Sequence, residues 1–128
     1  MKLVKESLNE IMNFERSNDP LVTLQVGKRA IIIKWLNTYN ITDYVINDDL
    51  TIDVKCGVNL YNKNLTSLPD FIKFNHVSGY FNCSVNQLTS LKGCPSTLDG
   101  DFYCYNNKVH FTEEDVKKFC KVKYSIYV

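Results

Sequence analysis

An internal repeat in the second half of the chain limits its possible folds more than any other feature. Three stretches begin and end on apolar residues seven positions apart, and they are Val58 to Leu65, Phe81 to Leu88 and Phe102 to Val109. Their first residues lie 23 and then 21 positions apart. Units of this length stack into solenoids, because one unit cannot bury its own apolar edge. The repeat therefore predicts a short solenoid of two to three units.

Equivalent positions in the units carry similar residues. The second and third units share an aromatic residue, a thiol, an asparagine and a closing apolar residue: Phe81, Cys83, Asn86 and Leu88 in one, and Phe102, Cys104, Asn107 and Val109 in the other. The first unit runs through Val58, Leu60 and Leu65 but has Lys63 at the asparagine position. We interpret this first unit as the degenerate, terminal one.

Stacking of the units would join equivalent residues into continuous interior columns. The predicted columns place Phe81 on Phe102, Cys83 on Cys104, and Leu88 on Val109. Asn86 and Asn107 would bond backbone groups at the turns, since an amide both donates and accepts hydrogen bonds. Gly79 and Gly100 precede the aromatic residues, where glycine allows a close approach of chains or a positive φ.

The segment before the repeats reads as a helical cap followed by a strand. Apolar residues at helical spacing predict a helix over 4–11, which the sequence Asn18-Asp19-Pro20 would end. A second helix is predicted over 28–39, and the residues expected toward the core are Ile31, Ile32, Trp35, Leu36 and Tyr39. Alternation over 50–54 then predicts a strand that leads into the repeats.

The segment after the repeats reads as a closing cap. Thr112 and Asp115 resemble a capping box, with aspartate in place of glutamate, and would begin a helix that carries Val116, Phe119 and Cys120. Alternation over 122–128 predicts a terminal strand. We therefore expect an α+β fold in one domain over 1–128. Its parts would be a helical cap over 1–40, a lead-in strand and repeats over 41–111, and a helix-strand cap over 112–128.

Parts of the sequence resemble known repeat proteins. The run Leu65-x-x-Leu68-Pro69, with the repeats at 81–88 and 102–109, resembles the short leucine-rich repeats of bacterial effector proteins. The runs 88–95 and 100–107 are similar to small leucine-rich-repeat-like proteins encoded by tailed bacteriophages and their hosts. The start at 4–8 and the end at 111–116 are also similar to that group, so the resemblance covers nearly the whole chain. The resemblance implies a leucine-rich-repeat-like fold, an interaction role and a bacterial cytoplasm. It carries over no catalytic residue.

Charge and hydropathy exclude several classes of function. Among 128 residues, 15 Lys and Arg face 14 Asp and Glu, for a net charge of +1. The chain therefore lacks the positive field that general nucleic-acid binding uses. No window approaches the ~18 apolar residues of a membrane span, and polar residues interrupt the first fourteen positions. We expect no nucleic-acid or membrane partner, no secretory signal and a cytoplasmic location.

Cysteine and histidine usage does not indicate a metal or cofactor site. Five cysteines without C-x-x-C spacing, together with the isolated His76 and His110, are not typical of a zinc site or of a disulfide framework. We interpret the thiols as reduced and as small core residues. Neither a paired-carboxylate nor a Cys–His arrangement can be placed by spacing, and no phosphate-binding glycine motif occurs. We expect no enzymatic activity, metal or cofactor.

Strand alternation predicts which residues face solvent. If Phe81 and Cys83 point inward, their neighbours point outward. The outward set is Asn59, Tyr61, Tyr80, Asn82, Ser84, Asp101, Tyr103 and Tyr105. Four tyrosines in eight positions are typical of recognition surfaces, although tyrosine also simply favours strands and the helical caps could carry the partner surface instead.

These observations favour a non-catalytic protein-interaction module, and the resemblance implies a phage product that binds a host defence protein. One alternative is a protein that sequesters a small ligand such as a nucleotide, through stacking and phosphate pairing. The other is a virion or assembly component. The oligomeric state stays open.

Overall fold

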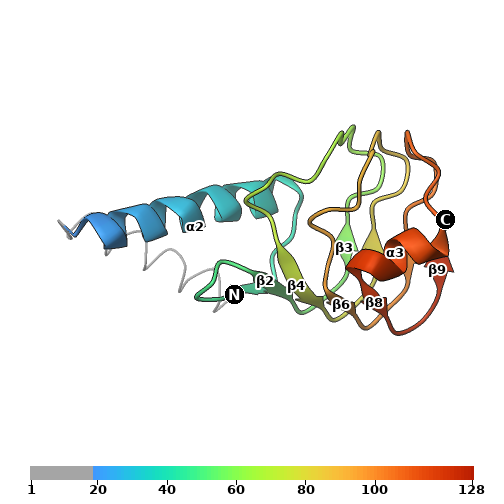
Figure 1. Cartoon of the computed structure of the whole chain (residues 1–128). Helices are drawn as coiled ribbons and strands as arrows, with labels where there is room; N and C mark the ends of the chain where they lie inside the picture. Colours follow the sequence, from blue (N-terminus) through green and yellow to red (C-terminus); the bar gives the residue numbers. More distant parts are fainter. Residues whose placement is uncertain (1–18) are drawn as a thin grey trace.

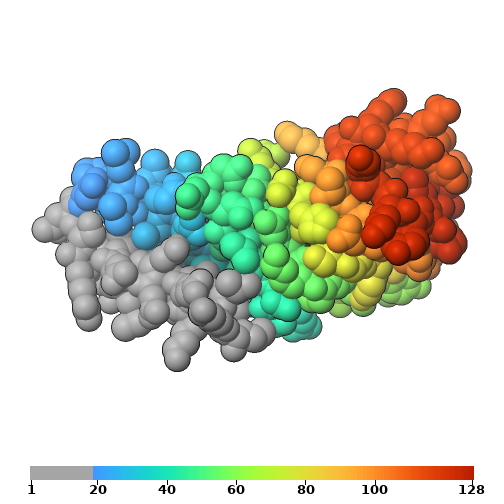
Figure 2. All heavy atoms as spheres, turned by 90° about the horizontal axis from the view of Figure 1, so that it is seen from below, coloured from blue at the N-terminus to red at the C-terminus, as the bar shows by residue number. Residues whose placement is uncertain are grey.

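The chain winds into a parallel-strand solenoid of about three turns. The computed structural model describes residues 19–128, in which two helices and nine short strands occur. Figure 1 shows helix α2 (Pro20–Thr38) at one end of the stack of coils and helix α3 (Glu113–Phe119) at the other. The space-filling view in Figure 2 shows the coils following one another in chain order.

Two sheets form the walls of the solenoid. The first has the order β1-β2-β4-β6-β8 and comprises β1 (Tyr44–Ile46), β2 (Ile52–Val54), β4 (Phe74–Val77), β6 (Thr97–Leu98) and β8 (Lys121–Val122). The second has the order β3-β5-β7-β9 and comprises β3 (Val58–Asn59), β5 (Phe81–Asn82), β7 (Phe102–Tyr103) and β9 (Ile126–Tyr127). All pairs are parallel except β1 with β2. Each complete coil thus gives one strand to each sheet.

The pairing confirms the repeat and extends it. Val58 pairs with Phe81, Phe81 with Phe102, and Phe102 with Ile126. The prediction of one terminal strand over 122–128 is wrong, because the chain forms two short strands there, one in each sheet. The C-terminal segment is therefore a further coil that continues the repeat.

The interior columns hold the coils together, with one exception. The rings of Phe81 and Phe102 lie 5.4 Å apart, and Cys83 and Cys104 are buried as predicted. Burial of each large apolar side chain contributes about 1.5–3 kcal/mol before chain entropy is counted. Val109, predicted to stack on the buried Leu88, is instead 40% exposed. The chain leaves the coil for α3 at this point, and Phe111 is buried two residues later.

Helix α2 begins earlier than predicted. Asp19 is its N-cap and accepts a hydrogen bond from the Leu21 backbone at 2.9 Å, while Pro20 occupies the first turn. The Asp-Pro sequence therefore starts a helix here. Ile31, expected in the core, is 53% exposed, and the buried residues are Val26, Arg29, Ile32, Ile33 and Leu36. The helix predicted over 4–11 lies outside the described residues.

The remaining predicted elements are shorter than expected. Leu50 adopts φ 70° in the turn of a β1–β2 hairpin, so only Ile52–Val54 of the lead-in strand forms. The capping box of α3 is confirmed, with the Asp115 amide donating to the Thr112 hydroxyl and the Thr112 amide donating to the Asp115 carboxylate. Val116 and Cys120 are buried, whereas Phe119, expected to face the core, is 43% exposed.

Candidate functional site

The outward surface around the β3-β5-β7-β9 sheet brings together seven of the eight predicted residues and adds one more, Tyr127. We call it the tyrosine face and define it by Asn59, Tyr61, Tyr80, Asn82, Asp101, Tyr103, Tyr105 and Tyr127. Strand pairing aligns Asn59 with Asn82, Asn82 with Tyr103, and Tyr103 with Tyr127. The face is therefore a ladder in which each coil supplies one outward residue at the same height.

Tyr103 and Tyr127 form the aromatic centre of this surface. Their rings are stacked, with centroids 4.7 Å apart and planes 9° apart. The Tyr103 hydroxyl donates to the Asp101 carboxylate at 3.4 Å, and the other oxygen of Asp101 accepts from the Ser125 amide at 2.9 Å. Desolvation, followed by the charge of Asp101, raises the pKa of the Tyr103 hydroxyl. The hydroxyl therefore stays protonated at neutral pH and serves as a donor.

Tyr127 is the residue that the sequence reasoning missed. It follows Ile126 as Tyr103 follows Phe102, but 24 positions separate the two units instead of 21 or 23. The signal was present in the alternation over 122–128. It was hidden because α3 occupies part of the last coil.

Three glycines let the coils meet closely beside the face. A Cβ atom added at Gly79 would lie 2.6 Å from the Gly57 nitrogen, and one added at Gly100 would lie 2.6 Å from the Gly79 carbonyl carbon. Neither Gly79 nor Gly100 has a positive φ, so close approach is the role they fill. The Tyr80 ring lies over Gly57, where an added Cβ would overlap it. The glycine column thus holds Tyr80 on the face.

Asparagine side chains fix the turns beneath the face. The Asn86 carbonyl accepts from the amides of Lys63 and Leu65, and its amide donates to the Leu60 and Cys83 carbonyls at 2.8 and 3.0 Å. Asn107 repeats this pattern in the next coil, accepting from the Leu88 amide and donating to the carbonyls of Cys83 and Cys104. The predicted role of both asparagines is confirmed.

Ser84 was predicted to face outward and is instead fully buried. Its amide donates to the Asn82 side chain, and its hydroxyl accepts from the Tyr105 amide at 3.1 Å. The next residue, Val85, has φ 56°. The same left-handed turn follows Tyr61 and Tyr105, where Asn62 and Asn106 have φ 53°, and those longer side chains still reach solvent. Ser84 is buried because its short side chain bonds the backbone of the next coil. Ser84 therefore supports the face and is not part of its surface.

The remaining members differ in exposure. Tyr61, Tyr80 and Tyr127 are 41–46% exposed, and Asn59 is exposed. Asn82, Asp101, Tyr103 and Tyr105 are half-buried. Half-buried aromatic rings on paired strands have little freedom to lose on binding, which suits them to contact a partner.

The opposite sheet carries a polar ladder around His76. Its Nδ1 lies 2.6 Å from the Thr97 hydroxyl, and its Nε2 lies 2.9 Å from the Asp99 carboxylate. His76 is isolated from other metal-ligating residues along the sequence, but Thr97 and Asp99 of the next coil supply its hydrogen-bond partners. Cross-strand pairs of this kind contribute about 0.2–1 kcal/mol each to a sheet.

Within residues 19–128, no group of three His, Cys, Asp or Glu side chains is placed to hold a metal ion.

The thiols divide into four buried groups and one exposed group. Burial raises the pKa of Cys104 to about 12 and that of Cys120 to about 11, and it also raises the pKa of Cys94. These thiols stay protonated and are weak nucleophiles and ligands. Cys56 is exposed, which departs from the expectation that all five thiols lie in the core.

No protein-family model, curated protein or solved structure matches this chain. None of the helices in residues 19–128 is long and apolar enough to cross a membrane.

Proposed function

We propose that this chain is a non-catalytic protein-interaction module that binds its partner through the tyrosine face. The observation that carries the proposal is the stacked pair of Tyr103 and Tyr127, aligned with Asn82 and Asn59 across four strands. Tyrosine and asparagine supply rigid contact area and adaptable hydrogen bonding, which is the composition of many binding surfaces.

The backbone beneath the face favours tight binding. Phe81 and Phe102 fill the interior directly behind it, and Asn86 and Asn107 pin the turns at its edge. A surface that is already ordered loses less entropy when a partner binds. Solenoids commonly use such an extended strand surface for recognition.

The class of partner that we propose rests on the sequence resemblance. We propose that the coils are leucine-rich-repeat-like, and that the protein is a phage product acting on a host defence protein in the bacterial cytoplasm. The repeated asparagine bonds of Asn86 and Asn107 support the first part. The net charge of +1 argues against a nucleic-acid partner.

The test is affinity purification from bacterial lysate with the wild-type protein and with the variant Tyr61→Ala/Tyr103→Ala/Tyr105→Ala. Because aromatic anchors dominate most interfaces, we expect recovery of the specific partner to fall at least about tenfold. Phe71→Ala is the matched control, since Phe71 has the same 41% exposure as Tyr61 but lies off the face. Equal recovery by the tyrosine variant and the control would reject this surface.

A thermal-shift assay with a panel of nucleotides distinguishes the small-ligand alternative from a protein partner. A ligand that binds only the native state raises the melting temperature. A nucleotide that raises the melting temperature of the wild-type protein but not that of the tyrosine variant would show that the tyrosine face binds a small ligand. The small-ligand alternative would then replace the protein partner in the proposal.

A further inference from the structure

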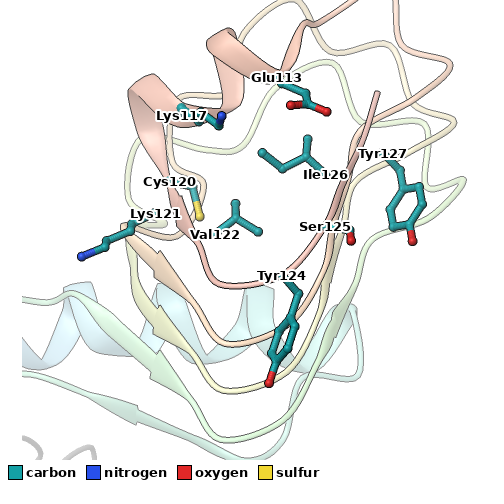
Figure 3. A pocket seen from close by; sticks show the side chains of 9 residues that line it. All are labelled: Glu113, Lys117, Cys120, Lys121, Val122, Tyr124, Ser125, Ile126 and Tyr127. Atoms are coloured by element: carbon teal, nitrogen blue, oxygen red, sulfur yellow. The ribbon is translucent and has the colours of Figure 1, made fainter.

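Among the described residues, the inner surface of the last coil is only partly covered. Strands β8 and β9 are the last strands of their sheets, and within residues 19–128 no strand pairs with their outer edges. Figure 3 shows Val122 and Ile126 pointing into the ring that this coil makes, with α3 crossing one side of it. The ring borders a hollow of about 710 Å³ that is open to solvent, and both side chains are half-buried. The same positions in the preceding coils, Leu98 and Phe102, are buried.

The backbone of β8 is prepared for one more strand. The amides of Lys121 and Lys123 donate to the carbonyls of Ser96 and Leu98 at 2.9 and 3.0 Å. Because successive residues of a strand direct their backbone groups to opposite sides, the N–H and C=O of Val122 point to the outer edge. An edge of this kind is a template for pairing with another chain.

The charged side chains around the β8 edge indicate what kind of peptide segment can pair with it. Lys121 and Lys123 flank Val122 and are exposed, while Val122 points inward. Figure 3 also shows Lys117 on the β8 side of the hollow and Glu113 above Ile126, on the β9 side. The β8 edge is therefore the positive side of the opening. A second copy paired through this edge about a two-fold axis would bring the lysines of both copies together, which is unfavourable.

We propose that the outer edge of β8 binds an extended acidic segment of a partner protein by strand addition. The segment carries an apolar residue between two acidic residues. Its apolar side chain covers Val122 and enters the hollow, and its two carboxylates pair with Lys121 and Lys123. Backbone bonds to Val122 supply the pairing, and the alternating side chains supply the selectivity. Tyr127 of the tyrosine face also lines the hollow, but the β8 edge belongs to the other sheet. The variants that test this inference change only Lys121, Val122 and Lys123, so it stands or falls independently of the proposed function.

The probe is a fluorescein-labelled nine-residue peptide in which glutamate and valine alternate. We expect saturable binding to the full chain, measured by fluorescence anisotropy, and increased protection of the Val122 amide in hydrogen exchange. Lys121→Glu/Lys123→Glu should weaken binding about tenfold, because two attractive cross-strand pairs become repulsive. Lys55→Glu/Lys63→Glu is the matched control, since it makes the same charge change at exposed positions in the first coil. Circular dichroism and melting curves verify that each variant is folded.

Two further peptides separate strand addition from general attraction. The first peptide has lysine in place of each glutamate, and it should not bind because its charge is reversed. The second keeps the glutamates but has every other backbone nitrogen methylated, and it should not bind because it has lost the N–H groups that strand pairing uses. Equal binding of either peptide, or an unchanged Val122 amide, would overturn the proposal. A stable dimer in sedimentation that Val122→Lys converts to a monomer would also overturn it, because a second copy would then occupy the edge.

Discussion

At the scale of single residues, Asn86 shows how one buried amide joins two coils. It satisfies backbone groups of Lys63, Leu65 and Leu60 in the preceding coil and of Cys83 in its own. Lys63 stands at the asparagine position of the first unit, and its own amide is one of the donors that Asn86 satisfies. The terminal unit is therefore completed by the side chain of its neighbour.

Removal of the Asn86 side chain should destabilise the protein strongly. We expect Asn86→Ala to lower the free energy of unfolding by about 3 kcal/mol, because several buried backbone groups lose their partners. Urea denaturation followed by circular dichroism measures the change. Gln87→Ala, at the exposed neighbouring position, should change stability by less than about 0.5 kcal/mol. Equal effects of the two substitutions would show that the amide bonds do not hold the coils.

Cys56 should be the only one of the five thiols that reacts quickly in the native protein. Partial burial, with the negative charge of Asp43, raises its pKa above the usual value. Because the thiolate is the reactive form, its labelling rate should rise about tenfold per pH unit from pH 7 toward the pKa. Ellman's reagent measures this rate, and Cys56→Ser should abolish the fast reaction. Rapid labelling of Cys104 in folded protein would contradict its burial.

At the scale of helices and strands, the sequence predicts an element best where its residue pattern fits only one kind of structure. The Phe81–Phe102 column and the Thr112–Asp115 capping box were predictable, because their residue types recur at fixed spacing. Asp19-Pro20 fits both the end of one helix and the start of another, and the apolar pattern did not decide between them. The strand β1 has three residues, which is too short for alternation to identify.

The candidate site was predicted in outline for a similar reason. Alternation correctly turned Tyr80 and Asn82 away from Phe81, but it takes no account of side-chain length, so it misplaced Ser84, whose short side chain bonds the next coil. Tyr127 and the pairing of His76 with Asp99 depend on contacts between coils more than 20 residues apart. Only the stacking of the coils shows these contacts.

Two glycine-to-alanine substitutions should have opposite effects on stability, one through contacts between coils and the other through helix propensity. A methyl group at Gly100 would meet the Gly79 backbone at 2.6 Å, so we expect Gly100→Ala to destabilise the protein by about 2 kcal/mol. Gly27 lies within α2 with no atom within 4 Å of an added Cβ. Gly27→Ala should therefore stabilise by about 0.5–1 kcal/mol. Urea denaturation of both variants measures the two changes, and the same sign for both would contradict the stacked arrangement.

At the scale of the whole molecule, the coils present two surfaces of different character. The tyrosine face is aromatic and spans the four strands of one sheet, whereas the β8 edge is cationic and belongs to the last coil alone. With a net charge of +1, the chain as a whole does not attract one class of charged partner. Under the two proposals, the geometry of the tyrosine face selects one partner and the exposed lysines of the β8 edge select an acidic segment.

Site-specific photo-cross-linking tests this assignment most directly. A benzophenone amino acid replaces Tyr61 in one variant and Phe71 in the other, so an aromatic group with the same 41% native exposure is exchanged on and off the face. After illumination in bacterial lysate, we expect the Tyr61 position to form a discrete adduct with one protein and the Phe71 position to form none. Adducts of equal yield at both positions, or an adduct at Phe71 alone, would contradict the account.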